Sequence, residues 1–194
     1  LKWLATRIPQ STRKLSWQFK MKRFVEGAQF SPAKAHYWWR IIFSDDEKQR
    51  LILPEFRNLV TGRDSADTYV HYYENVDVDD ELQRSIYSDI KVFLSGSILG
   101  KVDTMTMAHS VEGRSPFLDY EMVELAAGIP SSLKVKGAGT KYILKRVMRD
   151  LLPKDIIARN KSGFNLPLGK WFREDLREFV DDVLNEDAVR KVEF

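Results

Sequence analysis

The chain has 194 residues, of which 43% are hydrophobic and 30% are charged, and its net charge is +3. This balance supports a folded core and excludes a wholly disordered chain, while the modest charge argues against a nucleic-acid partner. There is no cysteine, which excludes disulfides, thiol catalysis and cysteine-bound zinc and is typical of a reducing cytoplasmic setting. No stretch approaches the roughly 20 apolar residues of a membrane helix, so no membrane partner is expected.

Helix-start signals recur through the first 80 residues. Ser31 stands before a proline, which is the order expected for an N-cap and the first helical residue. Ser44 is followed by three acidic residues, and the last of them, Glu47, completes a capping box. The turn-like sequence at 61–67 leads into a helix predicted to end near Glu74. This half of the chain is therefore predicted to be helical.

A long amphipathic helix is predicted to begin at residues 79–80. Its apolar side chains recur at spacings of three and four residues, which places them on one side of a helix. They are Leu82, Ile86, Ile90, Phe93 and Leu94. The triplet Ser95-Gly96-Ser97 predicts a break, with its second serine capping a next helix that reaches about Ser110. A further helix is predicted over 121–129, where a proline stops it.

The last third of the chain has a glycine-rich loop at 136–140 and a second loop at 159–169, followed by amphipathic helices. Between the loops, basic residues recur every four positions, with one more beside them, and would form a basic face on a helix. They are Lys141, Lys145, Arg146 and Arg149. Such a face is either simply solvated or provides a positive field near a phosphate. Since a strand pattern occurs only at 133–135, the chain as it stands is predicted to be all-α.

One glycine-containing stretch resembles a phosphate-binding loop but lacks essential residues. The sequence at 96–101 is one residue too short for a P-loop, and Val102 stands where a Ser or Thr would bind magnesium. A helix break explains this stretch better. His36, His71 and His109 do not have the spacing of a metal site, so packing or surface polarity is expected for them and no metal ligand is predicted.

The sequence from 109 to 119, HSVEGRSPFLD, reads as a helix end followed by an irregular turn that carries Glu112 and Arg114. Charged residues on such a loop are common in functional sites, although the two could also form only an ion pair. Together with the preceding residues, KVDTMTMAHSVEGRSPFLD (101–119) resembles a segment of the asparagine synthetases. The usual form of that segment is KVDRxSMAHxLEARxPFLD.

Three further blocks follow in the order found in that family. They are ELAAGIPSSLKVKG (124–137), GTKYILKRVMRDLLPKDII (139–157) and RNKSGFNLPLGKWF (159–172). Residues 1–93 fit the family more loosely. The resemblance implies that residues 1–194 are the C-terminal helical part of an asparagine synthetase-like domain, with the strong match over 101–172.

The resemblance also implies what the rest of the protein would supply. The family fold is an α/β, HUP-like ATP pyrophosphatase domain, whose parallel sheet would lie mainly upstream of this chain together with the nucleotide-binding half and a glutaminase domain. Those missing parts are the expected partners, and ATP and Mg²⁺ are the expected cofactors of the full-length protein. The chain alone is expected to bind neither, to be inactive, and to expose an apolar surface that promotes homo-oligomers.

The reaction implied by the resemblance has two steps. ATP adenylates the side-chain carboxylate of aspartate and releases pyrophosphate, and ammonia from glutamine then forms the amide. Lys161, in the loop before Gly163, matches the lysine that contacts the phosphates and stabilises their developing charge. Glu112 and Arg114 would line or brace the cleft. The further candidates for cofactor binding are Lys141, Lys101 and Asp103.

Departures from the family pattern leave the substrate open. Gly113 replaces the usual alanine, Thr104 replaces a frequent arginine, and Ser95-Gly96-Ser97 replaces a proline and acids. The carboxylate could instead be that of a beta-lactam synthetase, or of an amidotransferase acting on sugars or peptides. A different class of function is a non-catalytic helical interaction module, in which Tyr37-Trp38-Trp39 would contact a partner. The same aromatic residues could instead form the seam with the nucleotide-binding half.

Overall fold

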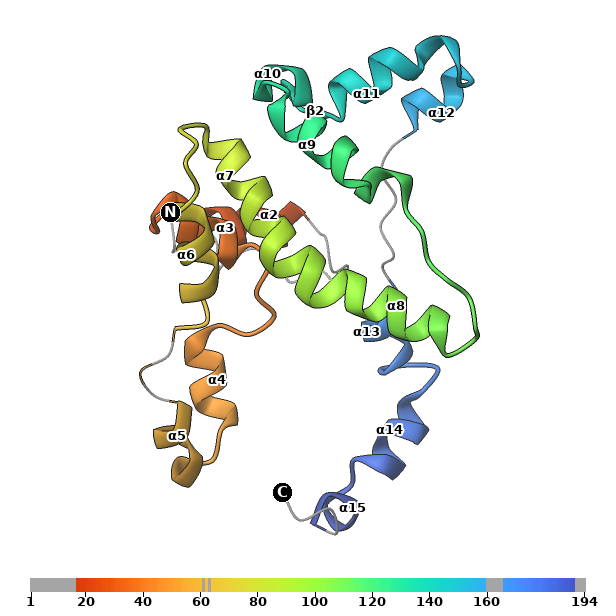
Figure 1. Cartoon of the computed structure of the whole chain (residues 1–194). Coiled ribbons are helices and arrows are strands. Elements are labelled where there is room, and N and C mark those ends of the chain that lie inside the picture. Colours follow the sequence, from red (N-terminus) through yellow and green to blue (C-terminus); the bar gives the residue numbers. More distant parts are fainter. Residues whose placement is uncertain (1–16, 61, 63, 160–165, 191–194) are drawn as a thin grey trace. The chain divides into compact units, whose positions relative to one another are not determined.

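The computed structural model describes residues 17–60, 62, 64–159 and 166–190. The described part is mostly helical and contains one two-stranded sheet, so the predicted all-α class is confirmed apart from that small hairpin (Figure 1). The chain divides into two compact units, one of residues 1–25 with 159–194 and one of residues 26–158. All candidate site residues except Lys161 belong to the second unit.

Short helices with the predicted caps form the first part of the described chain. The hydroxyl of Ser31 accepts the backbone N–H of Lys34 at 3.5 Å, and a proline follows it as the first helical residue. The capping box is confirmed: Ser44 Oγ accepts the N–H of Glu47 at 3.3 Å, and the Glu47 carboxylate accepts the N–H of Ser44 at 2.7 Å. The helices are α2 (Trp17–Gly27), α3 (Pro32–Trp38), α4 (Asp45–Leu51), α5 (Pro54–Val60) and α6 (Asp67–Glu74).

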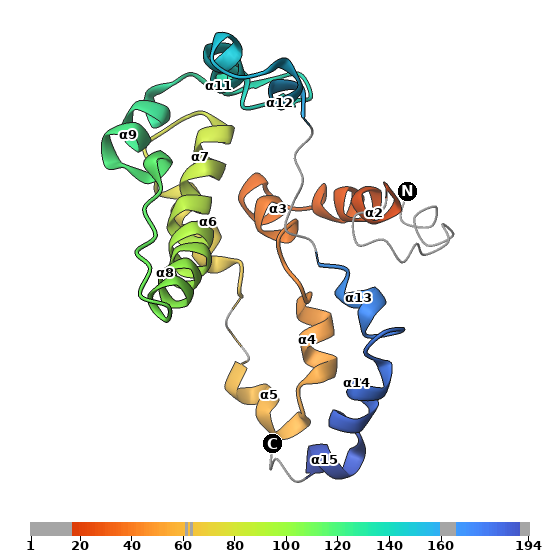
Figure 2. The same ribbon diagram turned by 90° about the vertical axis from the view of Figure 1, so that its right-hand side faces the viewer.

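A long uninterrupted helix follows, and α6 packs against its first part (Figure 2). Its N-cap is Asp80, whose carboxylate accepts the N–H of Gln83 at 2.9 Å. Three segments make up the helix: α7 (Glu81–Ser88), the π-helix η1 (Asp89–Leu99) and α8 (Gly100–Met107). The predicted start of this helix is therefore confirmed.

The predicted helix break at Ser95-Gly96-Ser97 is wrong. The Ser95 hydroxyl donates to the carbonyl of Lys91 one turn back, so it stays inside the helix and does not cap a new one. Apart from the neighbouring residues and the backbone of the helix itself, no described atom lies within 4 Å of the position that a Cβ would take at Gly96, so the glycine makes no tight contact. A single Gly costs about 1 kcal/mol in a helix, which the long flanking segments outweigh.

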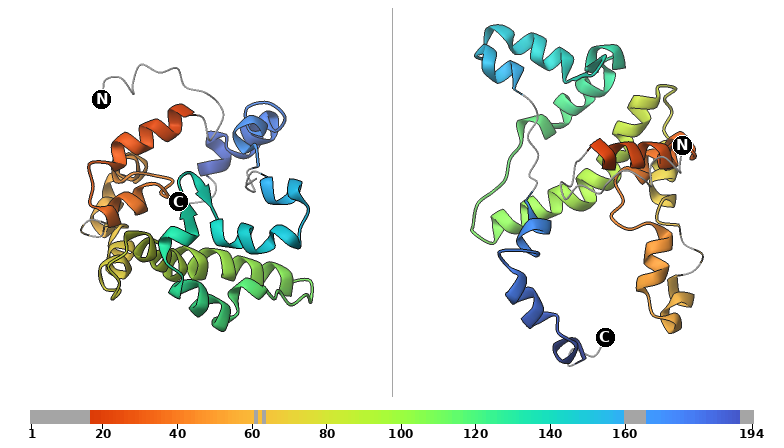
Figure 3. Two further views of the ribbon diagram at one scale, coloured as in Figure 1. Left: turned by 90° about the horizontal axis from the view of Figure 1, so that it is seen from above. Right: turned by 180° about the vertical axis from the view of Figure 1, so that it is seen from behind.

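Short elements around a β-hairpin complete the larger unit. The strands are antiparallel, with Val135 opposite Thr140 and Lys136 opposite Gly139 (Figure 3). The strand predicted at 133–135 begins only at Val135, because the residues before it form a helical turn. The elements are the 3₁₀ turn η2 (Pro116–Leu118), α9 (Tyr120–Gly128), α10 (Ser131–Lys134), β1 (Val135–Lys136), β2 (Gly139–Thr140), α11 (Tyr142–Val147), the 3₁₀ turn η3 (Met148–Asp150) and α12 (Lys154–Ala158).

The described part of the other unit after residue 165 is also helical. Helix α13 begins at Leu168, inside the loop predicted at 159–169. The amphipathic helices predicted at the end of the chain follow it. Lys170 pairs with Glu174 at 3.6 Å across one helical turn. The elements are α13 (Leu168–Trp171), α14 (Arg177–Val183) and α15 (Glu186–Arg190).

The buried residues of the described chain are few, and apart from Gly27 at the end of α2 they lie where α3, α6 and α7 meet. Tyr69 is 7% exposed, and its ring contacts the rings of His36 and Tyr37 at centroid distances of 6.1 and 5.6 Å. Many large apolar side chains elsewhere remain exposed, including Ile42 at 82% and Leu59 at 77%. Among the described residues, no helix is both long and apolar enough to cross a membrane.

Candidate active site

The segment that follows α8 turns back onto that helix. Ser110 adopts the left-handed conformation, with φ 56°, which is uncommon for a residue other than glycine. The N–H of Val111 then donates to the carbonyl of Thr106 at 3.0 Å. This reversal places the next residues, including Glu112 and Arg114, beside the end of α8 and outside any regular element.

Glu112 and Arg114 form a two-pronged ion pair. Arg114 Nε donates to Glu112 Oε1 at 2.9 Å, and Arg114 Nη2 donates to Oε2 at 3.1 Å. The side chains are 82% exposed for the arginine and 67% exposed for the glutamate. An exposed pair contributes about 0–1 kcal/mol to stability. The ion pair therefore contributes little to the stability of the fold, but it orients an accessible carboxylate.

Gly113 lies between the two charged residues and contacts α8 closely. A Cβ at this position would stand 3.2 Å from Val102 Cγ1 and 3.6 Å from Thr106 Oγ1. Lys101 and Asp103 are the neighbours of Val102 on the helix, and both are exposed. The motif at 101–119 thus brings four of the predicted site residues to the same region, with Glu112 and Arg114 in direct contact.

Lys141 lies on a different element. It has φ 58°, and it occupies the N-cap position of α11 just after the hairpin. Among the described residues, no hydrogen bond or ion pair joins Lys141 to Glu112 or Arg114. Lys161 lies outside the described residues, so the expectation that it converges with Glu112 and Arg114 stays a prediction.

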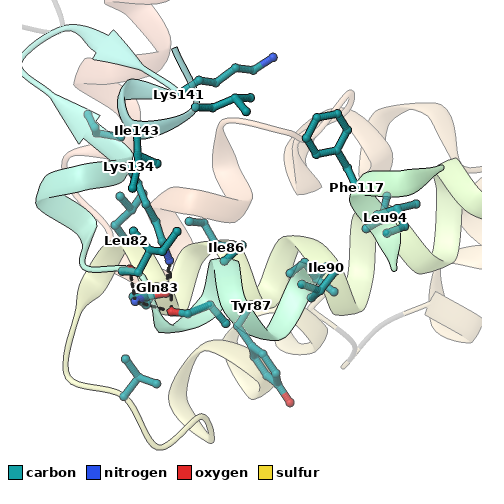
Figure 4. A pocket seen from close by; sticks show the side chains of 18 of the residues that line it. Leu82, Gln83, Ile86, Tyr87, Ile90, Leu94, Phe117, Lys134, Lys141 and Ile143 are labelled. Atoms are coloured by element: carbon teal, nitrogen blue, oxygen red, sulfur yellow. Dashed lines mark hydrogen bonds between the residues drawn. The ribbon is translucent and has the colours of Figure 1, made fainter. Parts of the chain in front are cut away.

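An apolar pocket of about 700 Å³ lies between the long helix and the elements that follow the motif (Figure 4). The Phe117 and Leu118 side chains, which lie near the end of the motif, form part of the pocket wall, and Lys141 also lines the pocket. Most of the other lining residues are apolar and come from α7, η1, α9 and α11. They include Leu82, Ile86, Ile90, Leu94, Val123 and Ile143.

Gln83 and Lys134 join the two walls of this pocket. Lys134 Nζ donates to Gln83 Oε1 at 2.7 Å and to the carbonyl of Ala127 at 3.3 Å. The Gln83 amide donates to the carbonyls of Ala127 and Ile129 at 3.0 and 3.2 Å. These carbonyls lie at the end of α9 and lack helical partners, so Gln83 from α7 and Lys134 from α10 cap that helix together. We call Gln83 and Lys134 the α9 clamp.

Burial lowers the pKa of Lys134, because the apolar surroundings disfavour the ammonium, while the charge of Asp80 acts in the opposite direction. Asp80 itself accepts a hydrogen bond from the Ser131 hydroxyl at 2.7 Å, which is the main cause of the lowered pKa of its carboxyl group. Sequence reasoning missed both clamp residues. The signal was present for Lys134, since it is the lysine that ends the P-x-x-x-K part of the block at 124–137.

A comparison with protein families identifies the family to which the chain belongs. The family model described as asparagine synthase matches residues 2–194, which is nearly the whole chain. The chain belongs to the asparagine synthase family. Apart from Leu1, both units of the structure fall inside this match.

Individual relatives agree with that family. The chain is 34% identical over 145 residues to "Asparagine synthetase [glutamine-hydrolyzing] 1" of Bacillus subtilis, which covers 75% of this chain and 22% of the relative. It is 37% identical over 124 residues to a putative asparagine synthetase of Mycobacterium bovis, covering 64% and 19%. The human asparagine synthetase is 30% identical over 104 residues, covering 48% and 18%. The chain thus spans about a fifth of the length of these relatives, and the search of solved structures found no match.

The acidic and histidine side chains of this asparagine synthase family member form no group of three suited to a metal ion within the part that the structure describes. His36 Nε2 instead donates a hydrogen bond to Asp89 Oδ1 at 2.8 Å, and Arg40 pairs with the other oxygen of the same carboxylate. These contacts join α3 to η1. His36 therefore takes part in a polar contact between these two elements, and its not being a metal ligand stays a prediction.

Proposed function

We propose that this chain is the helical C-terminal part of a synthetase domain that forms an amide from a carboxylate, ATP and ammonia. The match of the asparagine synthase family over residues 2–194 supports this proposal most strongly. In the proposed protein, an upstream α/β, HUP-like half holds the parallel sheet, a glutaminase domain releases ammonia from glutamine, and the carboxylate is the side chain of aspartate. The cysteine-free sequence favours a cytoplasmic location.

Glu112 and Arg114 are proposed to form one wall of the active site. Arg114 uses two N–H groups to hold both carboxylate oxygens of Glu112. Each oxygen keeps a further lone pair, because an ionised carboxylate has about four acceptor positions. Glu112 can therefore accept a hydrogen bond from the incoming ammonia while Arg114 keeps the carboxylate oriented.

The described cations fit the phosphate end of ATP. Lys101 and Lys141 are exposed, and the ion pairs of the described residues do not involve either of them. We assign them and Lys161 to the phosphates, where positive charge stabilises the leaving pyrophosphate. When ATP is bound, it supplies the adenylyl group that is transferred to the carboxylate.

Magnesium is a weaker fit to the residues that the structure describes. Asp103 offers one exposed carboxylate on α8, but no cluster of acidic or histidine ligands surrounds it within the described ranges. Mg²⁺ prefers one or two carboxylates together with phosphate oxygens and water. Asp103 can therefore be one ligand of a shared site, and the chemistry assigned to Glu112 and the lysines does not depend on it.

The test is pyrophosphate release by the protein that joins this chain to its nucleotide-binding half, supplied with ATP, aspartate and ammonia. Lys161→Ala and Glu112→Gln are expected to lower kcat at least about 100-fold, as for other groups that act on transition-state charge. Lys154→Ala, an exposed lysine of the same segment, is the matched control and should change kcat less than about twofold. Full activity in Glu112→Gln would contradict the role given to Glu112.

The same assay tests the other parts of the proposal. Residues 1–194 alone are expected to release no pyrophosphate with aspartate. A panel of carboxylates separates aspartate from a beta-lactam precursor, a sugar acid or a peptide. Absence of pyrophosphate release with every member, in a protein that folds, would favour the non-catalytic interaction module.

A further inference from the structure

The apolar pocket of about 700 Å³ has no role in the amide-forming chemistry proposed above. Its volume falls within the range of about 300–1,000 Å³ that is common for small-molecule sites. All of its lining residues belong to the larger unit, so the pocket is contained within that unit. It is therefore a candidate site for a small molecule.

The pocket has a polar end and an apolar end. The Lys134 ammonium and the Gln83 amide meet at one end, whereas Leu94 and Phe117 lie at the other (Figure 4). Ile86, on the long helix, lies between these ends (Figure 4). The geometry fits an elongated ligand that has one polar head group and an apolar tail.

Lys134 brings a half-buried positive charge to the polar end. Its ammonium donates to Gln83 Oε1 and to the carbonyl of Ala127, and both of these acceptors are uncharged. The ion pairs of the described residues do not include Lys134. Since an ammonium has three N–H groups, one stays available for a ligand. Burial lowers the pKa of Lys134, which is the behaviour of a charge that its neighbours do not fully compensate.

These features select the charge of the head group. A carboxylate would accept the remaining N–H of Lys134 and compensate its charge, and a charge-assisted hydrogen bond is about twice as strong as a neutral one. A head group with two or more negative charges would lose its hydration against a single ammonium, which is unfavourable. Lys141 also lines the pocket, but it is exposed and its ammonium points away from Gln83 (Figure 4). A head group with one negative charge therefore fits best.

We propose that this pocket binds a free aliphatic carboxylate, with the carboxylate on Lys134 and the alkyl tail against Ile86, Ile90 and Phe117. Each methylene of the tail adds to the affinity, because the burial of apolar surface is favourable in proportion to the area removed from water. The Lys134 ammonium fixes the direction of the ligand, because only its head group can pair with the charge.

This site is independent of the proposed synthetase chemistry. The contacts assigned to the ligand involve none of the side chains given a role in amide formation, and binding can be measured without any turnover. Failure of the carboxylate to bind would therefore leave the proposed amide-forming function untouched, and failure of the synthetase assay would leave this site untouched.

The experiment titrates the 194-residue chain by calorimetry with sodium hexanoate, octanoate and decanoate, each below the concentration at which it aggregates. Decanoate is expected to bind with a Kd below about 1 mM. Each pair of added methylenes should tighten binding about three- to tenfold, because more apolar surface is buried. The heat capacity should fall on binding, which is the mark of apolar burial.

One pair of variants tests the head group. Lys134→Met removes the ammonium but keeps an apolar stem, and it should weaken decanoate binding at least about fivefold, because the charge-assisted hydrogen bond is lost. The same variant should change the binding of 1-decanol, which has the tail without the charge, less than about twofold. Lys145→Met is the matched control, because Lys145 is exposed on α11 and lies outside the lining, and it should change decanoate binding less than about twofold.

A second pair of variants tests the tail and leaves the α9 clamp intact. Ala126 is exposed at the pocket on α9, so Ala126→Trp fills space that the tail would occupy. It should weaken the binding of both decanoate and 1-decanol at least about fivefold. Ala158→Trp adds the same side chain at the exposed end of α12, outside the lining, and should change binding less than about twofold. Circular dichroism checks that each variant keeps its helix content.

Several results would overturn the proposal. Equal losses of decanoate affinity in Lys134→Met and Lys145→Met would remove the assignment of the head group, and full affinity in Ala126→Trp would place the ligand outside the pocket. Binding of phospholipid vesicles without binding of free decanoate would point to a membrane surface.

Two other occupants of the pocket are tested by the same titration. A decanoate affinity that falls as the concentration of the chain is raised would show that a second copy fills the pocket. Loss of binding in the protein that joins this chain to its nucleotide-binding half would show that the added half fills it. Either result would overturn the proposal, whereas retained binding in both conditions supports it.

Discussion

The α9 clamp gives a sharp stability prediction. In Gln83→Ala, the carbonyl of Ile129 loses the Gln83 amide, Ala127 keeps only the longer bond from Lys134, and the lysine loses its nearest acceptor. A net hydrogen bond contributes about 0.5–1.5 kcal/mol, and water can reach this half-exposed site, so three lost bonds should lower the free energy of unfolding by about 1–3 kcal/mol.

The measurement is urea unfolding followed by circular dichroism, with the slope checked for a change in the unfolded state. Gln49→Ala is the control, because Gln49 is an exposed glutamine on α4, and it should change the stability by less than about 0.5 kcal/mol. A Gln83→Ala variant as stable as Gln49→Ala would refute the reasoning that the clamp caps α9.

Lys134→Met extends the same test to pH. The pKa of Lys134 is lowered in the folded protein, so the unfolded chain binds its proton more tightly, and this group disfavours folding below its folded pKa. That penalty is relieved as pH rises through the window between the folded pKa and the ordinary lysine pKa of 10.5. The stability of the wild type relative to Lys134→Met should therefore increase across this window, and a flat difference would contradict the assignment.

Three further predictions concern other parts of the chain. Tyr73 is 5% exposed and donates to Glu81 at 2.5 Å, and burial raises its pKa to about 12. The stability that this protonated phenol contributes should be lost as pH rises from about 10 through about 12, and Tyr73→Phe, compared by urea unfolding, should remove that pH dependence. Ser44→Ala breaks the capping box of α4 and should cost about 1 kcal/mol by the same assay. Arg114→Ala should change stability by less than about 0.5–1 kcal/mol, because its ion pair is exposed, yet lower pyrophosphate release at least about tenfold by freeing Glu112; a loss of stability without a loss of activity would contradict this.

Local signals in the sequence predicted the helix starts well. Ser31, Ser44 and Asp80 each use their own side chain to bond an N–H within three residues, so no distant part of the chain is needed to form these caps. The helix break predicted at residues 95–97 was wrong because its outcome depends on the flanking segments and not on the triplet alone. Serine and glycine only weaken a helix, and the stretches on both sides of the triplet continue it.

In the candidate site too, contacts between residues close in sequence could be predicted, and contacts between distant residues could not. Glu112 and Arg114 are two residues apart, and the possibility that they pair was visible in the sequence. The α9 clamp joins residues 51 positions apart, and helical periodicity carries no information about which helix meets which. Lys141 was predicted on the basic face of a helix, but its left-handed backbone places it at the N-cap, outside the regular turns of α11.

The π-helical segment between α7 and α8 alters how changes in chain length would act. Its hydrogen bonds span five residues instead of four, so each turn holds more residues than an α-helical turn. A helical wheel drawn with one period from 81 to 107 therefore assigns the wrong faces to Lys101 and Asp103. Inserting or deleting one residue within 89–99 could be absorbed by converting a turn between the two forms. Such a conversion would leave α8, and with it the loop of Glu112, facing nearly the same direction, whereas the same change in a regular α-helical turn would rotate both about the helix axis.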